Sequence, residues 1–301
     1  MRIVVTGGTG FIGREVVDQL LQGGDGHQLV VTSRDPAAHR RAFDDRVELV
    51  EAFAGDAVSL GRAFTGADVV VQAVQFPGHP VEDASRGRSY EEVDGRGTEV
   101  AARVAAALGV RRFVYLSGAG AGEGREQSWF RAKDRAEAAI REAGLEYCVL
   151  RPSRIYGPRD RSMNRLIFFC RHLPLVPVIG DGRTPIQPVH VADVARCVAE
   201  AALRTDATQL VFGLGGPETL SMDEIHRTIQ KVLGRQRPLL HHPVPLMKLL
   251  VLPMALLPEP ILSPGAVDFV TQEVRVDPKP AAEYFGFEFR KLETGLREYL
   301  P

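Results

Sequence analysis

Cysteine is scarce in this 301-residue sequence, which holds only Cys148, Cys170 and Cys197. No two of them form a C-x-x-C pair, and none has a histidine at the spacing of a zinc site. Because each lies in an apolar stretch, we expect three reduced, structural thiols, as is usual in a cytoplasmic protein. This scarcity excludes a disulfide-stabilised scaffold and a cysteine-based metal centre.

The chain also lacks an excess of either charge. Its 37 Lys and Arg residues balance 38 Asp and Glu residues, and the net charge is -1. The two signs are interspersed without long blocks, so there is no basic field for a nucleic acid and we expect none as a partner. Strand-like residues begin at Ile3, which predicts that no signal peptide is present and that the protein is cytoplasmic.

A long hydrophobic run is missing as well. The most apolar stretch, residues 246–257, carries Lys248 as its only charge and is interrupted by Pro253. It is far shorter than the roughly 20 residues that span a bilayer. It forms either two buried short helices, an apolar lid over a lipophilic substrate, or a patch that touches the inner face of a membrane or a membrane protein.

What the sequence does contain is a glycine-rich stretch at its start, Thr-Gly-Gly-Thr-Gly-Phe-Ile-Gly at residues 6–13. It follows a β-branched run and precedes an amphipathic pattern, which predicts a strand, a loop and a helix. Glycines at three positions would allow a tight turn, admit a pyrophosphate to the backbone and pack the helix on the strand. The helix N-terminus would receive the phosphates. We therefore predict a dinucleotide-binding loop formed by Gly7, Thr9, Gly10, Phe11, Ile12 and Gly13.

The second predicted strand ends at Ser33 and Arg34. An acidic residue at this place would accept hydrogen bonds from the adenosine ribose, whereas Arg34 with Ser33 suits a 2′-phosphate. We therefore expect NADP(H) in preference to NAD(H). Arg14 and the pair Arg40 and Arg41 either assist in binding this phosphate or are solvated surface charges.

Two further positions fall at the carboxyl ends of predicted strands. Asp56 follows the third strand, and it either faces the adenine amino group or caps the next helix. Ala73 lies at the end of the fourth strand, predicted over residues 68–74. Because ligands bind beyond the carboxyl ends of parallel strands, we expect Ala73 to border the nicotinamide.

Strands and helices alternate along much of the chain. This predicts an α/β fold with a doubly wound parallel sheet of the Rossmann type and a small, mostly helical C-terminal lobe. We expect residues 1–156 with 186–214 to form the NADP(H)-binding domain, and residues 157–185 with 215–301 to form the substrate or partner lobe. Ser221 and Glu224 predict a capping box, whereas His241 and His242 are expected in a loop.

Several segments are, as a set, typical of one family: residues 6–13, Ala-Gly-Asp at 54–56, Phe-Val-Tyr-Leu-Ser at 113–117, Lys133, residues 150–158 and residues 188–195. With them the chain resembles an extended or atypical short-chain dehydrogenase/reductase, similar to NAD-dependent epimerases and dehydratases. Within that family it resembles the atypical branch of complex I accessory subunits and NmrA-like sensors. The resemblance covers about the first two thirds of the chain.

The resemblance also implies where the chemistry should lie. In most members a Tyr in a Y-x-x-x-K pattern transfers the proton, the Lys holds the nicotinamide ribose, and a Ser or Thr polarises the substrate oxygen. Here Trp129 replaces the Tyr, and an indole has no proton to transfer. Gly118 stands at the hydroxyl position, which leaves Ser117 as the nearest hydroxyl. The resemblance thus implies Lys133 as a ribose ligand and catalytic-site residue, with Ser117 as a polar contact.

Two functions follow. The chain is either an NADP(H)-dependent oxidoreductase or epimerase/dehydratase-like enzyme acting on a lipophilic small molecule, or a non-catalytic NADP(H)-binding protein with a structural, assembly or redox-sensing role. Tyr90, Tyr115 and Tyr156 have no Lys four residues later, and we expect them to serve in packing. The resemblance also makes a homodimer, formed through the helices beside the fourth and fifth strands, one assembly to consider.

Overall fold

The protein is represented by a computed structural model that describes residues 1–24, 26–76, 82–251 and 273–301. A seven-stranded sheet forms its centre, in the order β11-β6-β5-β4-β1-β2-β3 with every neighbouring pair parallel. Its strands are β1 (Arg2–Thr6), β2 (Gln28–Ser33), β3 (Val47–Glu51), β4 (Val69–Gln72), β5 (Arg112–Leu116), β6 (Glu146–Pro152) and β11 (Leu210–Leu214). The predicted doubly wound α/β fold is confirmed.

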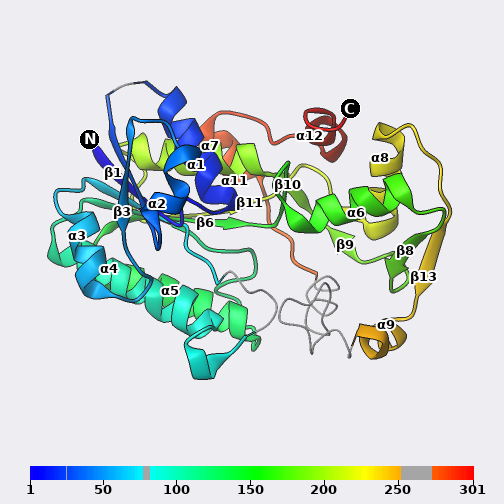
Figure 1. Cartoon of the computed structure of the whole chain (residues 1–301), viewed down its shortest axis with the longest axis horizontal. Helices are drawn as coiled ribbons and strands as arrows, with labels where there is room; N and C mark the ends of the chain where they lie inside the picture. The colour runs from blue at the N-terminus through cyan, green and yellow to red at the C-terminus, as the bar shows by residue number, and fades with distance from the viewer. Residues whose placement is uncertain (25, 77–81, 252–272) are drawn as a thin grey trace.

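Helices cover both faces of the sheet (Figure 1). On one face lie α1 (Phe11–Gln22), α7 (Val191–Leu203) and α11 (Lys279–Phe285), and on the other α3 (Ala57–Phe64), α4 (Gly97–Ala107) and α5 (Ser128–Glu142). Alternate side chains of each strand enter opposite cores: Val5 and Val71 pack on the α1 side, Val4 and Val70 on the α4 side. Strands buried on both faces explain the nearly continuous apolar runs of the sequence.

The direction of the chain reverses between β1 and β4. From β1 the chain continues through β2 to β3 at one edge, whereas β4, β5, β6 and β11 follow one another to the other edge. A crevice for a nucleotide opens at such a reversal, beyond the carboxyl ends of the strands. Gly7 and Ala73 directly follow these two strands, and the Ala73 N–H donates to the Thr6 carbonyl at 3.1 Å.

A smaller body continues from β6 and lies to one side of the sheet (Figure 1). Its helices α6 (Arg161–His172), α8 (Met222–Val232) and α12 (Leu292–Arg297) share an apolar core that includes Ile167, Ile229 and Leu296. The predicted capping box of Ser221 and Glu224 begins α8. The described residues of this body also form α9 (Val244–Val251) and three strand pairs. These are β7 (Arg154–Tyr156) with β10 (Pro188–His190), β8 (Val176–Ile179) with β13 (Leu239–His242), and β9 (Pro185–Ile186) with β12 (Leu220–Ser221).

Some elements differ from the sequence predictions. His241 and His242 lie in β13 and not in a loop, because β13 pairs with β8 along the edge of the smaller body. A π-helical turn, η3 (Glu91–Arg96), directly precedes α4 in the chain. The apolar stretch 246–257 enters α9, and residues 252–257 lie outside the described residues. No helix in the described ranges is long and apolar enough to cross a bilayer.

Candidate functional site

The glycine loop after β1 has the geometry that its sequence predicts. Gly7 has a φ of +69°, and a Cβ there would lie 2.5 Å from the Ala73 carbonyl oxygen. A Cβ on Gly13 would collide with the Gly7 carbonyl oxygen, so both positions need glycine. The Gly10 N–H donates to that same oxygen at 2.9 Å and closes the turn. The loop is therefore tight, and it lies against the end of β4.

The first turn of α1 is available to an anion. Gly10 is its N-cap, it supplies no capping side chain, and the turn contains no acidic residue. The leading N–H groups of a helix have no partners within the helix, and the macrodipole favours negative charge there. Thr9 and Phe11 flank the turn in partly exposed positions, and Ile12 packs against the core. These residues fit the pyrophosphate of a dinucleotide.

At the end of β2, Arg34 is exposed while Ser33 is buried. The Ser33 hydroxyl lies 3.1 Å from His39 Nδ1 and accepts from the Asp35 N–H at the same distance. Among the described residues no ion pair engages Arg34. Arg40 differs, because its guanidinium donates to the carbonyl oxygens of residues 43, 44 and 47.

The Arg14 guanidinium is also partly engaged, since it lies over the Phe43 ring at 4.2 Å and 3.6 Å from Asp18. Arg34 thus differs from Arg14 and Arg40, whose guanidinium groups are engaged. Asp56 acts as the N-cap of α3: its carboxylate accepts from the N–H groups of Val58 and Ser59. Hydrogen bonds from Ser59 hold the Asp56 pKa below its usual value.

The Trp129 indole occupies the area that the missing hydroxyl residue would need. Trp129 lies in the first turn of α5, and its ring is so close to Gly118 that a Cβ there would collide with it. The ring also meets Phe130 edge to face, with centroids 4.8 Å apart. The two departures from the usual pattern, Trp129 and Gly118, thus form one packing unit.

Lys133 is buried at the carboxyl end of β5, one turn along α5 from Trp129. Its Nζ lies 3.0 Å from Asp94 Oδ1 and 3.5 Å from the Leu116 carbonyl oxygen. Burial opposes the Lys133 charge, but Tyr115 and Asp94 more than offset this effect and raise the pKa of Lys133. Burial also raises the pKa of Tyr115 to about 12, so its phenol is neutral at pH 7 and Asp94 is the counter-ion of Lys133.

Ser117 faces a different acid. Its hydroxyl donates to Glu137 Oε1 at 2.7 Å, and the buried Glu137 also accepts two hydrogen bonds from Arg151 and one from Arg141. Burial would raise the Glu137 pKa, but the hydrogen bonds from Arg151 and Ser117 outweigh it and lower the pKa. Ser117 and Lys133 therefore flank the same strand end with separate partners. A contact of Ser117 with substrate stays a prediction.

Tyr90, Tyr115 and Tyr156, three of the six tyrosines of the chain, are buried as their predicted packing role requires. Tyr115 and Tyr156 are completely buried, and the Phe76 and Tyr90 rings pack edge to face. The Tyr156 hydroxyl points to the backbone at residues 291 and 292. None of these phenols reaches solvent far enough to replace the missing proton donor.

Sequence reasoning missed Asp94 and Glu137, the two buried acids of this region. The signal for Glu137 was its position four residues after Lys133, which places both on one side of α5. Asp94 had a weaker signal, an acid between Val93 and Gly95 in a stretch that reads as helix. In the described part of the chain no group of three or more His, Cys, Asp or Glu could hold a metal ion.

A recess opens in the smaller body between β7, α6, β9 and α8. Its cavity volume is about 50 Å³. Arg154 and Asp160 supply polar atoms to its wall, and burial lowers the pKa of Arg154 and raises that of Asp160. The remaining wall is largely apolar and includes Met163, Leu166, Ile186, Met222 and Ile225.

Comparison with known proteins identifies the family of the chain. The profile of the family described as NAD(P)H-binding matches residues 7–205, which is more than half of the 301 residues. The chain therefore belongs to the NAD(P)H-binding family of atypical short-chain dehydrogenases/reductases.

Two relatives illustrate the range of the family. Subunit 9 of the NADH dehydrogenase [ubiquinone] 1 alpha subcomplex from Arabidopsis thaliana mitochondria is 30% identical over 257 residues, covering 83% of this chain and 62% of the relative. The chain thus spans about three fifths of that subunit. Ceramide reductase of Caulobacter vibrioides is 30% identical over 244 residues, covering 81% of this chain and 74% of the reductase.

Solved structures share the fold at lower identity. The NADPH-dependent quinone oxidoreductase QOR2 of Escherichia coli, solved with NADPH, superposes with a TM-score of 0.77 at 18% identity over 99% of this chain and all of that chain. UDP-glucose 4-epimerase from Thermotoga maritima superposes with a TM-score of 0.72 at 22% identity, covering 99% of this chain and 96% of the epimerase. At these identities the likeness establishes the fold.

Proposed function

We propose that the protein is an NADP(H)-dependent oxidoreductase that acts on a lipophilic small molecule without a tyrosine proton donor. The proposal is carried by the uncapped first turn of α1 at the end of β1 and by the buried Lys133 at the end of β5, which would hold the phosphates and the ribose of the cofactor. When bound, NADPH would supply a hydride. The chain's own residues would bind and orient the cofactor and the substrate, and they would exclude water.

Arg34 supports the preference for NADP(H). It is exposed at the end of β2, where an arginine can form charge-assisted hydrogen bonds with a 2′-phosphate. The last residue of β2 is Ser33, so no carboxylate stands at that position to repel the phosphate. The name of the E. coli neighbour, an NADPH-dependent quinone oxidoreductase, is consistent with this preference.

The largely apolar recess supports a lipophilic substrate. Its Met163, Leu166 and Met222 side chains would contact an apolar group of the substrate, while Arg154 would meet a polar group. The names of two relatives point to reduction: ceramide reductase, and (4-alkanoyl-5-oxo-2,5-dihydrofuran-3-yl)methyl phosphate reductase from Streptomyces griseus at 27% identity. The proton that accompanies the hydride would come from water or a substrate hydroxyl, because Trp129 has none to give.

A second function is favoured by the Trp129 and Gly118 unit. Because the indole fills the area around Gly118, the chain would hold NADP(H) without turnover and serve as a structural or redox-sensing protein bound to a partner. The mitochondrial relatives are named as subunits of NADH dehydrogenase, which supports this alternative.

One experiment separates the two functions. NADPH oxidation would be followed with the purified protein and fractions of a lipid-soluble metabolite extract, alongside Lys133→Ala and the exposed control Lys279→Ala. Turnover in one fraction that Lys133→Ala loses and Lys279→Ala keeps would support the enzyme. Tight NADPH binding without oxidation in any fraction would support the binding protein.

A further inference from the structure

Charge is unevenly distributed along this nearly neutral chain. Residues 161–180 contain three arginines and no acidic residue, and residues 225–251 contain five Lys or Arg residues and no acidic one. The structure brings the two segments together, because α6 and α8 share a core and β8 pairs with β13. This part of the smaller body therefore has a local excess of positive charge.

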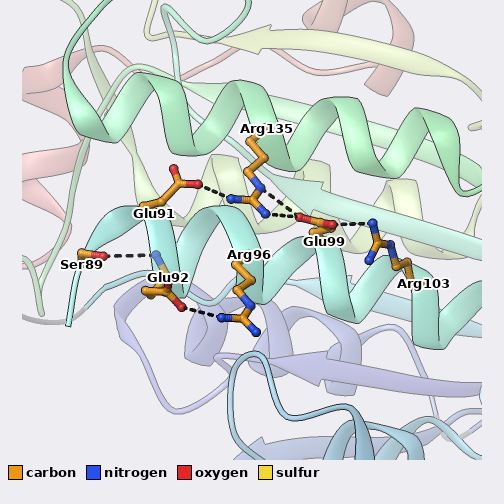
Figure 2. Close-up of polar contacts among 7 residues, drawn as sticks. All are labelled: Ser89, Glu91, Glu92, Arg96, Glu99, Arg103 and Arg135. Carbon is orange, nitrogen blue, oxygen red and sulfur yellow. Dashed lines mark hydrogen bonds and ion pairs between the residues drawn. The ribbon is translucent and has the colours of Figure 1, made fainter. Parts of the chain in front are cut away.

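The helices beside the large sheet have no such excess (Figure 2). Each arginine drawn there has a glutamate partner: Arg96 with Glu92, Arg103 with Glu99, and Arg135 with both Glu91 and Glu99. Carboxylates thus neutralise that surface from within the chain, and exposed pairs of this kind contribute little to stability. The same face provides a reference for the arginines of the smaller body.

Four arginines of the smaller body lack partners of this kind. They are Arg171 at the end of α6, Arg183 after β8, and Arg235 and Arg237 before β13. In the described ranges of the chain no carboxylate forms an ion pair with any of them. Asp181, the acid next to Arg183 in its loop, accepts instead from the Arg183 backbone N–H at 2.9 Å. The four guanidinium groups therefore keep donors for an external anion.

Apolar side chains lie on the strand pair between these charges. Val176 and Val178 of β8 are buried in the core of the smaller body, so Pro177 points to the other side of the strand. Its register partner in β13 is Leu240, whose side chain is 44% exposed. The outer face of the pair is therefore apolar and open to solvent.

Two more leucines extend this face. Leu175 directly precedes β8 and is 48% exposed, and Leu246 of α9 is 44% exposed. The start of α9 lies against the end of β8, since a Cβ on Gly180 would be 3.5 Å from Val244 Cγ2. We define the apolar ridge as Leu175, Pro177, Leu240 and Leu246. Its elements β8, β13 and α9 lie at the end of the smaller body away from the seven-stranded sheet (Figure 1).

The chemistry of the ridge favours one kind of partner. Prolines at 177, 238 and 243 remove backbone N–H groups from this strand pair, which discourages the addition of a strand from another protein. A nucleic acid would offer phosphates to the arginines but little apolar contact to the leucines. An anionic bilayer satisfies both, because its phosphates bind guanidinium groups and its acyl boundary accepts leucine side chains.

We propose that the apolar ridge and the arginines beside it dock the protein on an anionic lipid bilayer. The leucines would enter the boundary between headgroups and acyl chains, while Arg183 and Arg235, both exposed, would bind headgroup phosphates. Few apolar residues take part, so the attachment would be peripheral and reversible. The inference concerns a surface of the smaller body and is independent of the proposed function.

The test is co-sedimentation of the full chain with sucrose-loaded vesicles of phosphatidylcholine alone or of an equal mixture with phosphatidylglycerol. The wild type should bind only the anionic vesicles, and added salt should release it. Arg183→Gln combined with Arg235→Gln should weaken this binding at least about tenfold. The matched control is Arg96→Gln combined with Arg103→Gln, which removes the same charge from the face in Figure 2 and should bind as the wild type does.

Leu240→Gln tests the apolar part of the surface. It should weaken binding to the anionic vesicles at least about fivefold, because a polar side chain gains nothing at the acyl boundary. Leu108→Gln is its matched control, since Leu108 ends α4 with the same 44% exposure, and it should bind as the wild type does. Circular dichroism and NADPH binding of each variant would confirm that the fold is kept.

Three results would overturn the inference: no binding of the wild type to anionic vesicles, equal binding to neutral vesicles, or equal losses in the ridge variants and their controls. Binding of duplex DNA without binding of vesicles would also overturn it and assign the ridge to a nucleic acid. Failure to bind NADPH would reject the proposed function alone, because the vesicle measurement needs no cofactor.

Discussion

The Trp129 indole lies directly against the Gly118 α-carbon, so the residue that replaces the family's tyrosine and the residue that replaces its hydroxyl partner depend on each other. A Cβ at position 118 would lie 2.6 Å from Cζ2 of the ring and closer still to Cη2. A tryptophan at 129 is thus compatible with glycine at 118, and a larger residue there would have to displace it.

Gly118→Ala should destabilise the protein, because the added methyl group must move the indole. Overpacking of this kind costs about 1–3 kcal/mol. Gly61→Ala in α3 is the matched control, since a Cβ at that glycine has no neighbour within 4 Å. Urea unfolding would measure both variants. An unchanged urea midpoint for Gly118→Ala would show that the indole moves at no cost. The inferred dependence of Trp129 on glycine at position 118 would then be wrong.

Gly13→Ala should abolish tight NADPH binding while Gly10→Ala weakens it less. A Cβ on Gly13 collides with the Gly7 carbonyl oxygen, so the loop must open, whereas a Cβ on Gly10 would lie 3.2 Å from that oxygen. Binding is measured by calorimetry, with circular dichroism to confirm folding. Equal affinities for the two variants would contradict the assignment of the loop.

Arg34→Gln should weaken binding of NADPH and leave NADH unchanged. Hydrogen bonds to a charged group contribute about 1.5–3 kcal/mol, which corresponds to roughly ten- to hundredfold in affinity. Arg41→Gln, an exposed neighbour, is the control. If the control loses the preference for NADPH and Arg34→Gln keeps it, the 2′-phosphate lies against Arg41.

Glu137→Gln should lower stability at neutral pH by about 3–5 kcal/mol, because Arg151 would lose its buried partner. The folded-state pKa of Glu137 is lowered, so its contribution is present above the unfolded value near 4.5 and is lost as the pH falls below it. The variant should therefore lose less stability on acidification than the wild type. Denaturant unfolding at a series of pH values measures this, with Glu142→Gln, exposed on the same helix, as control. If the stability of the wild type and of Glu137→Gln falls equally as the pH is lowered, the role of Glu137 is wrong.

Much of this architecture could be predicted because it is encoded locally. Apolar strands, the glycines at 7 and 13 and the capping box at Ser221 each depend on neighbours in sequence, and the structure confirms them. The contact between Gly118 and Trp129 could not be predicted. In the sequence each residue appears only as the loss of a family residue, and their close packing is visible only in the structure.

The buried acids show a second limit of sequence reasoning. Asp94 and Glu137 look like ordinary charged residues of amphipathic helices. Their burial depends on a π-helical turn and on Arg151 of β6, neither of which leaves a periodic signal. His241 and His242 were misplaced for a similar reason, because β13 exists only through pairing with β8.

Trp129 has one more consequence, since it is the only tryptophan of the chain. All indole fluorescence of the protein originates beside Lys133, at the end of the crevice where a nicotinamide is expected. Reduced nicotinamide absorbs light at the wavelengths that tryptophan emits, so a bound cofactor would quench this emission by energy transfer. The side chain that removes the family's proton donor thereby provides an intrinsic optical probe of occupancy.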